Sequence, residues 1–149
     1  MSHSKTKIWI HAVFSTKNCQ PLIRKTVRDF LYRHIRQELT NAGCIADSIN
    51  GIEDHVHILF LLQPQLAVSD VMKQIKGSSS HYINGLDVIP DKFAWQTGYG
   101  AFSVIESQVE RVRQYIANQE QHHQKMTFAE EYRRFTKQYG FLIDEEGRV

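Results

Sequence analysis

The sequence predicts an α+β fold built on one antiparallel sheet, and three observations support this prediction. The chain has 149 residues, of which 42% are hydrophobic and 23% charged, a composition that suits one globular domain with a hydrophobic core. Short segments rich in β-branched and aromatic residues alternate with segments whose apolar residues recur at three- and four-residue intervals. Neither an internal repeat nor a long linker interrupts them, so we expect residues 1–149 to form a single domain.

These patterns predict three strands and one helix in the first half of the chain. In order, they are a strand over residues 7–14, a helix that begins near Pro21 and ends near Gly43, and strands over residues 44–52 and 55–62. The two later strands are joined by a turn that lies either at Asn50-Gly51 or at Glu53-Asp54. The sequence leaves this choice open.

The second half predicts another helix, another strand and two C-terminal helices. In order, they are a helix capped by Ser69 that loosens at residues 77–80, a strand within residues 93–105, and helices opened by the capping boxes Ser107/Glu110 and Thr127/Glu130. The order strand, helix, strand, strand, helix, strand is that of a split βαβ, ferredoxin-like sheet with helices on one face. Such a sheet leaves its other face free for a ligand or a partner subunit.

Composition narrows the function classes only a little. No apolar stretch approaches the roughly 20 residues of a membrane span, and the first residues show no signal-peptide core. Cys19 and Cys44 have neither disulfide-framework nor zinc spacing, so we expect a cytoplasmic protein without a membrane partner. A formal charge of +2 is compatible with a nucleic-acid partner but does not require one.

The most informative motif is the pair His55 and His57 in a predicted strand. Alternate strand residues point to the same face, so the two side chains start only about 6–7 Å apart and could hold one metal ion. Asp54 or Glu53 could accept a hydrogen bond and fix a ring tautomer. The alternative is a pair of partly buried histidines with ordinary hydrogen bonds. His11, across the sheet, is either a core histidine or an auxiliary site residue, and we favour the core.

A second candidate group is Tyr115 with Gln119, four residues apart on a predicted helix and therefore on one face. A tyrosine hydroxyl has a pKa of about 10 and attacks phosphate poorly unless a metal polarises the phosphate or a base takes its proton. The Gln119 amide oxygen could add a third metal ligand. The alternative is that Tyr115 belongs to the core beside Val112. We expect His122-His123 to be a solvated helix end.

Three segments together resemble a known family. They are the histidine strand at 55–57, the glycine-containing segment 95–104 and the helical segment 115–119. In this order, and in a chain of this size, they are similar to the single-tyrosine HUH transposases, the small transposases of insertion-sequence two-hundred-like elements and their repeat-associated relatives. The resemblance extends from the first strand to the third helix.

The resemblance implies a ferredoxin-like HUH catalytic domain over residues 1–149 and a homodimer whose active sites can be shared between subunits. It implies a divalent metal, Mg²⁺ or Mn²⁺, held by His55, His57 and Gln119. Tyr115 would attack a phosphate in single-stranded DNA and form a 5′-phosphotyrosine link, and the DNA would be recognised through a hairpin.

Five further residues are candidates for contact with DNA phosphate or for ordinary solvated surface. They are Lys73, Lys76, Ser78, Arg111 and Arg113.

Three other functions remain as alternatives. Histidine-triad nucleotide hydrolases need a third alternating histidine, and Leu59 stands at that place, which counts heavily against this class. A non-catalytic protein could bind hairpin nucleic acid on the same sheet. A structural dimer would use the histidines only for stability.

Overall fold

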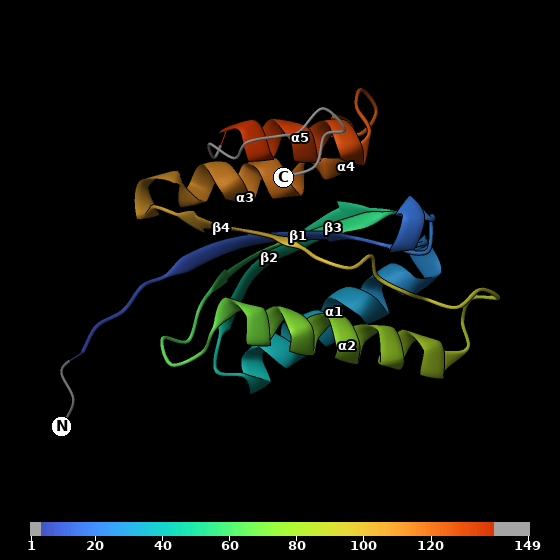
Figure 1. The fold of residues 1–149 in the computed structure, drawn as a ribbon, viewed down its shortest axis with the longest axis horizontal. Coiled ribbons are helices and arrows are strands. Elements are labelled where there is room, and N and C mark those ends of the chain that lie inside the picture. Colours follow the sequence, from blue (N-terminus) through green and yellow to red (C-terminus); the bar gives the residue numbers. More distant parts are fainter. Residues whose placement is uncertain (1–3, 139–149) are drawn as a thin grey trace.

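In the computed structural model, which describes residues 4–138, one antiparallel sheet lies between two layers of helices (Figure 1). The strands are β1 (Trp9–Ser15), β2 (Ile45–Ile52), β3 (His55–Leu61) and β4 (Gly100–Val104), arranged in the order β2-β3-β1-β4. The helices are α1 (Lys25–Asn41), α2 (Val68–Leu86), α3 (Val109–Ala117), α4 (Gln119–His122) and α5 (Phe128–Gln138). This arrangement confirms the predicted ferredoxin-like fold with added C-terminal helices.

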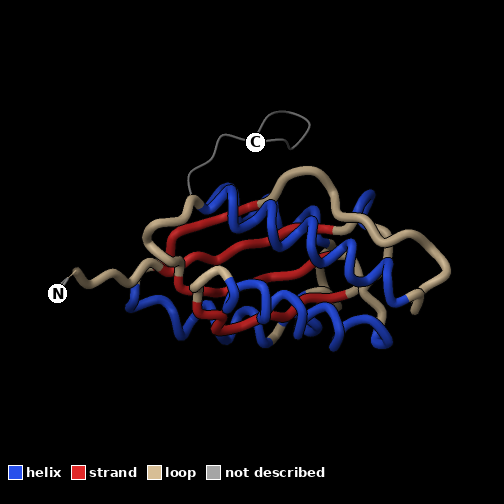
Figure 2. The backbone as a smooth tube through the Cα atoms, turned by 90° about the horizontal axis from the view of Figure 1, so that it is seen from below, coloured by secondary structure: helices blue, strands red, loops and turns tan. Residues whose placement is uncertain are grey.

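The main core lies between the sheet and the layer formed by α1 and α2, which Figure 2 shows crossing one face of the strands. The apolar residues of α1 recur at four-residue intervals, so they form one stripe that faces the sheet. They meet the side chains of β3 that point to this face. All of these residues are fully buried, namely Val27, Leu31, Ile35 and Leu39 of α1 with Val56, Ile58 and Phe60 of β3.

The structure shows which of the two predicted turns joins β2 to β3, and it shows that α1 begins later than predicted. The turn lies at Glu53-Asp54. The helix begins at Lys25 instead of near Pro21, because Ile23 is fully buried and its backbone N–H donates to the carbonyl of Glu53 at 2.8 Å. This short extended segment therefore supports the turn that precedes His55.

Helix α2 runs without interruption through residues 77–80, so the predicted loosening is wrong. Ser79 is fully buried and its hydroxyl accepts a hydrogen bond from the Trp95 indole at 2.9 Å. At Ser79 the small side chain therefore serves close packing, whereas a Cβ at Gly77 would meet nothing within 4 Å. Ser69 does not cap the helix either, since α2 begins after Ala67 and has no side-chain cap.

The second layer, formed by α3, α4 and α5, covers the face of the sheet that the sequence left free for a ligand or partner (Figure 1). A Cβ at Gly100 of β4 would lie 2.9 Å from Cε2 of Tyr132, so the missing side chain lets α5 approach the sheet closely. No helix within residues 4–138 is long and apolar enough to cross a membrane.

Two polar contacts fasten α3 to β2 of the same chain. The Arg113 guanidinium binds both carboxylate oxygens of Asp47, at 2.8–3.1 Å. The Asn50 amide donates to the carbonyl of Ile116 at 2.9 Å.

Of the two predicted capping boxes, one is confirmed in part and the other is wrong. A short 3-10 turn over Glu106–Gln108 precedes α3, which has no side-chain cap, so the Ser107/Glu110 box is wrong. Glu106 binds Lys7 at 2.8 Å and accepts a second hydrogen bond from the Trp9 indole, and these contacts fix the entry of α3. The Thr127/Glu130 pair makes one of the two bonds of such a box, with the Glu130 N–H donating to the Thr127 hydroxyl at 3.2 Å.

Candidate metal centre and nucleophile

Two histidines of β3 project from the face of the sheet that the second helical layer covers. His55 is the first residue of β3, and His57 lies opposite Val13 of β1. Strand alternation therefore points both side chains away from α1 and α2. Both residues are fully buried, and their ring centroids are 5.1 Å apart.

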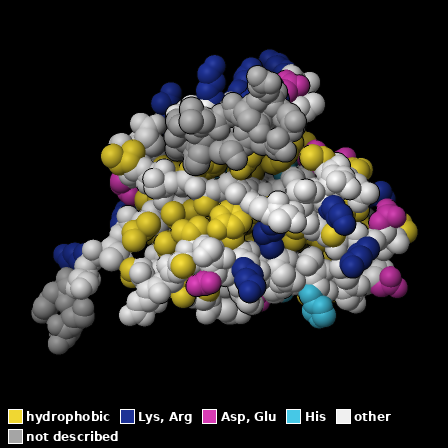
Figure 3. Space-filling model, viewed as in Figure 1, with side chains coloured by type: hydrophobic (Ala, Val, Ile, Leu, Met, Phe, Trp, Pro, Cys, Tyr) yellow, Lys and Arg dark blue, Asp and Glu magenta, His cyan; other side chains and the backbone are white. Residues whose placement is uncertain are grey.

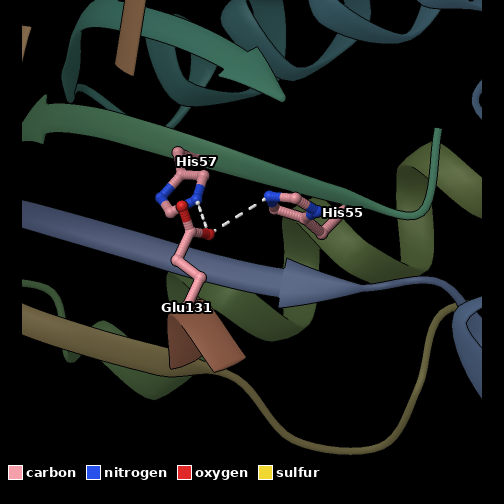
Figure 4. A group of neighbouring side chains, drawn as sticks. All are labelled: His55, His57 and Glu131. Atoms are coloured by element: carbon pink, nitrogen blue, oxygen red, sulfur yellow. Dashed lines mark hydrogen bonds and ion pairs between the residues drawn. The ribbon is translucent and has the colours of Figure 1, made fainter. Parts of the chain in front are cut away.

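The carboxylate of Glu131, from α5, points toward both imidazoles (Figure 4). Its Oε1 atom is 2.9 Å from Nε2 of His57 and 3.3 Å from Nε2 of His55. Glu131 is only 1% exposed. One ligand atom from each of the three side chains lies within 4.8 Å of the other two, which is the convergence that a bound metal ion needs.

Tyr115 reaches the same carboxylate through its other oxygen. The Tyr115 hydroxyl donates a hydrogen bond to Oε2 of Glu131. The Tyr115 ring lies 5.7 Å from the His57 ring between centroids. Glu131 therefore contacts the tyrosine with one oxygen and the histidine pair with the other.

Gln119 also joins the group, although not through the helix that its spacing predicted. Helix α3 ends at Ala117, and α4 begins at Gln119 after a non-helical Asn118, so a continuous helical face through Tyr115 and Gln119 is wrong. After the break, α4 packs against β2, and the Gln119 side chain reaches His55 at the start of β3. As a result Gln119 is fully buried, with Oε1 2.9 Å from Nε2 of His55.

The other ring nitrogens of the histidine pair also have partners. Nδ1 of His55 is 2.8 Å from Oδ1 of Asp54, an acceptor that the sequence suggested. Nδ1 of His57 is 2.9 Å from Nε2 of His11, which is buried like a core residue but bonds to the site. Because the Nδ1 atoms are held in this way, the Nε2 atoms face the carboxylate of Glu131.

His123 is not part of a solvated helix end, so that prediction is wrong for this residue. Its side chain is only 3% exposed, and its Nε2 lies 3.2 Å from Oε2 of Glu131. Its Nδ1 lies 2.9 Å from the carbonyl of Met126, in the turn that leads from α4 to α5. This turn folds the ring back over His55, with 4.5 Å between ring centroids.

Burial and hydrogen bonding move the histidine pKa values in opposite directions. Burial lowers the pKa of His57 to about 4 and that of His11 to about 3. Burial alone would lower the pKa of His55 as well, but its hydrogen bonds with Asp54 and Glu131 outweigh this effect and raise the pKa to about 9.

The pKa values of Glu131 and Tyr115 also shift in opposite directions. Burial would raise the pKa of the Glu131 carboxyl, but the hydrogen bonds from His55 and His57 hold it well below its usual value. Burial and the contact with Glu131 raise the pKa of the Tyr115 hydroxyl. The protein therefore holds an ionised carboxylate against a protonated phenol, and the phenol must lose its proton before it can act as a nucleophile.

The donor set fits a divalent cation. Two imidazole nitrogens, one carboxylate oxygen and one amide oxygen meet among buried side chains, from His55, His57, Glu131 and Gln119. Such a mixture of nitrogen and oxygen donors accepts several divalent ions and does not distinguish sharply between Mg²⁺ and Mn²⁺.

The metal-free protein should lose stability as the pH rises from about 6.5 to about 9. The folded pKa of His55, about 9, lies above the value of about 6.5 expected in the unfolded chain. Protonated His55 therefore stabilises the folded protein fully at a pH below the unfolded pKa, and this stabilisation disappears as the pH rises through the folded pKa. It contributes at most about 3 kcal/mol to the free energy of unfolding. Urea unfolding of chelator-treated protein at both ends of this interval measures the loss.

Variants isolate the contribution of His55 to this pH dependence. The lowered pKa values of His57 and His11 affect stability only at lower pH, because the folded pKa of each residue lies below its unfolded pKa. The His55→Gln variant should show a smaller loss of stability, whereas His81→Gln, an exposed position on α2, should behave as wild type. Equal losses in wild-type and His55→Gln protein would contradict the assignment.

Three of the five candidate DNA contacts lie on α2, across the sheet from the histidine pair. Lys73 is exposed. Lys76 donates to the carbonyl of Gln96 at 2.7 Å and so holds the segment before β4. The Ser78 hydroxyl is 2.7 Å from Nε2 of His34. The structure thus places this group apart from the site and uses two of its members in internal contacts.

The other two candidates lie on α3, the helix that carries Tyr115. Arg113 binds Asp47 of β2, so its charge is matched within the chain. Arg111 is exposed on the same helix. Figure 3 shows further Lys and Arg side chains along the outer edge of the layer formed by α3 and α5, where α5 contributes Arg133, Arg134 and Lys137.

The sequence did not single out Glu131 as a site residue. One signal was available, because Phe128, Glu131 and Phe135 recur at intervals of three and four residues on α5. A carboxylate in an otherwise aromatic stripe is expensive to bury without a partner and therefore indicates a specific contact.

Comparisons with known proteins bear on the family and the fold of this chain. Residues 4–119 match the family described as "Transposase IS200 like". Among solved structures, a protein of Deinococcus radiodurans R1 described as a candidate transposase is 25% identical, with a TM-score of 0.65 over 80% of this chain and 95% of that one. No curated protein matches the sequence significantly.

A second solved structure shows likeness in fold alone. It is described as a REP-associated tyrosine transposase bound to a REP hairpin, and it is 17% identical to this chain. Its TM-score is 0.61, over 83% of this chain and 74% of that one. Glu131 and α5 lie beyond the residues that the family model matches.

Proposed function

The chain belongs to the IS200-like transposase family, and on that premise we propose that it cuts and rejoins single-stranded DNA with Tyr115 as nucleophile. One observation carries the proposal. The Tyr115 hydroxyl and the Nε2 atoms of His55 and His57 meet at the carboxylate of Glu131 within a single chain.

His55, His57 and Gln119, together with Glu131, would hold the divalent cation, Mg²⁺ or Mn²⁺. When bound, the cation would polarise the scissile phosphate and stabilise the charge that develops on its oxygens. The contacts of Asp54 and His11 keep the two rings in the orientation that presents Nε2.

Tyr115 and Glu131 take part in the reaction directly, Tyr115 by bonding to phosphorus and Glu131 by accepting the phenolic proton. The Tyr115 oxygen forms a bond to phosphorus while the bond from phosphorus to the 3′ oxygen of the preceding nucleotide breaks. Glu131 Oε2 already accepts the Tyr115 hydrogen bond and is placed to take the phenolic proton. The departing 3′ oxygen takes up a proton from the solvent and becomes a hydroxyl. Attack of a 3′ hydroxyl on the 5′-phosphotyrosine reverses these steps and rejoins DNA without ATP.

We propose that the DNA is recognised through a hairpin, in line with the hairpin bound by the structural neighbour. The exposed Arg111 would meet the phosphate backbone from the tyrosine helix. Because Arg113 and Asn50 fasten α3 to its own sheet, Tyr115 would act on the histidine pair of the same chain. A homodimer, which the family resemblance implies, would not need to exchange tyrosine helices.

The test is a search for a covalent protein–DNA adduct. The protein is mixed with Mn²⁺ and a labelled pool of single-stranded hairpin oligonucleotides, then denatured and separated by electrophoresis. We expect a labelled band that survives denaturation and is absent when a chelator is present. Hairpin binding that weakens with salt but never yields an adduct would instead indicate a non-catalytic hairpin-binding protein.

A further inference from the structure

A pocket beside Tyr115 extends the site beyond the reacting groups. It lies between the C-terminal end of β4, one face of α3 and the second half of α5, and it has a volume of about 590 Å³. Pockets of roughly 300–1,000 Å³ are typical of sites for small organic groups. The lining residues used below are His11, Ile105, Gln108, Arg111, Val112 and Phe135.

The pocket follows the tyrosine helix toward the nucleophile. Arg111, Val112 and Tyr115 are spaced by one and three residues, so they lie on one face of α3, and Gln108 lines the pocket from the turn just before the helix. Arg111 offers a cation, while Val112 offers an apolar wall. A ligand in this pocket would therefore lie next to the Tyr115 side chain.

His11, one of the lining residues, carries a buried polar atom without a partner. It is 1% exposed, and its Nδ1 has no hydrogen-bond partner among residues 4–138. If His57 presents the Nε2 lone pair to a cation, its Nδ1 carries the hydrogen and donates to Nε2 of His11. A neutral His11 then carries its own hydrogen on Nδ1. That atom becomes a buried donor without an acceptor, which a ligand would satisfy.

We propose that the pocket receives one unpaired nucleotide of the substrate strand, adjacent to the phosphate that Tyr115 attacks. The base lies against the apolar walls of Ile105, Val112 and Phe135 and presents an acceptor atom to Nδ1 of His11. Arg111 meets a neighbouring backbone phosphate. A flat base with acceptor atoms, attached to an anion, matches the apolar, donor and cationic groups of the lining. This inference rests on the function proposed above.

The test combines a substituted oligonucleotide with a variant that fills the pocket. In a hairpin oligonucleotide that the protein cleaves, the nucleotides on either side of the scissile phosphate are replaced one at a time by abasic deoxyribose. Ile105, 69% exposed, is replaced in the Ile105→Trp variant, and Ile45→Trp is the matched control at a 62% exposed position outside the pocket. The measurement is kcat/KM for adduct formation.

For wild-type protein and Ile45→Trp, we expect one abasic position to lower kcat/KM by about 5- to 150-fold, the range that stacking of one base supplies. For Ile105→Trp with the intact oligonucleotide, kcat/KM should fall by a similar factor. Adding the abasic substitution should lower the kcat/KM of this variant by less than about a further twofold, because both changes remove the same interaction. The proposal would be overturned if the abasic substitution lowered kcat/KM by the same factor in Ile105→Trp as in wild type. It would also be overturned if Ile105→Trp cleaved the intact oligonucleotide at the wild-type rate. Absence of any wild-type adduct would instead refute the proposed function.

Discussion

Tyr115→Phe is expected to abolish the covalent adduct with DNA while hairpin binding stays within about twofold of wild type. The substitution removes the only atom of the side chain that can bond to phosphorus, so the rate of adduct formation should fall by at least about 10³-fold. Hairpin affinity should persist because Arg111 and the outer basic edge of the second layer are unchanged. Denaturing electrophoresis measures the adduct, and a filter-binding titration measures the affinity.

Tyr132→Phe provides the matched control, since it removes a hydroxyl from another tyrosine of the same helical layer. Tyr132 lies on α5, with its ring stacked on Phe128 at 5.8 Å between centroids. It should form adduct at the wild-type rate. An adduct that persists in Tyr115→Phe would place the nucleophile elsewhere. Loss of hairpin binding together with the adduct would mean that Tyr115 supports the fold instead of the reaction.

His57→Ala is expected to weaken Mn²⁺ binding by at least about 100-fold, because it removes one nitrogen ligand from a buried site. His57 is fully buried and its Nε2 is 2.9 Å from Oε1 of Glu131, so no solvent-exposed group can replace it. The change should be visible without any DNA, by the electron paramagnetic resonance signal of free Mn²⁺ during a titration. Adduct formation should be lost in parallel.

Folding of this variant must be checked in the same experiment, since removing a buried side chain leaves a cavity. Circular dichroism of His57→Ala should retain the wild-type spectrum below its melting temperature. His81→Ala, on the exposed side of α2, should bind Mn²⁺ as wild type does. If a folded His57→Ala protein keeps the wild-type affinity for Mn²⁺, the metal is held by other residues.

Local patterns were sufficient for the sheet and for the position of the histidine pair. Alternation along β3 assigns His55 and His57 to one face and Val56 and Ile58 to the other, and this assignment is correct because strand geometry depends only on neighbouring residues. The order of elements and the stripe of α1 likewise led to the ferredoxin-like fold.

Local patterns failed where a contact between distant segments outweighed a weak local preference. Gly77 and its serine neighbours favour a break, but Ser79 packs against Trp95 and α2 continues. Ser107 favours a cap, but Glu106 binds Lys7 and Trp9 and sets the entry of α3 differently. In both cases the deciding partner is many residues away along the chain.

The sequence by itself determined the sheet and the placement of the histidine pair on one of its faces, since each follows from a short-range period, whereas Tyr115 was singled out through the family resemblance. Only the tertiary structure decided what joins them. Glu131 is 74 residues from His57 and 16 from Tyr115, and it meets both because α4 and the turn after it carry α5 back over the sheet. No local pattern encodes that return. It depends on how a whole helical layer buries its apolar face against β1 and β3.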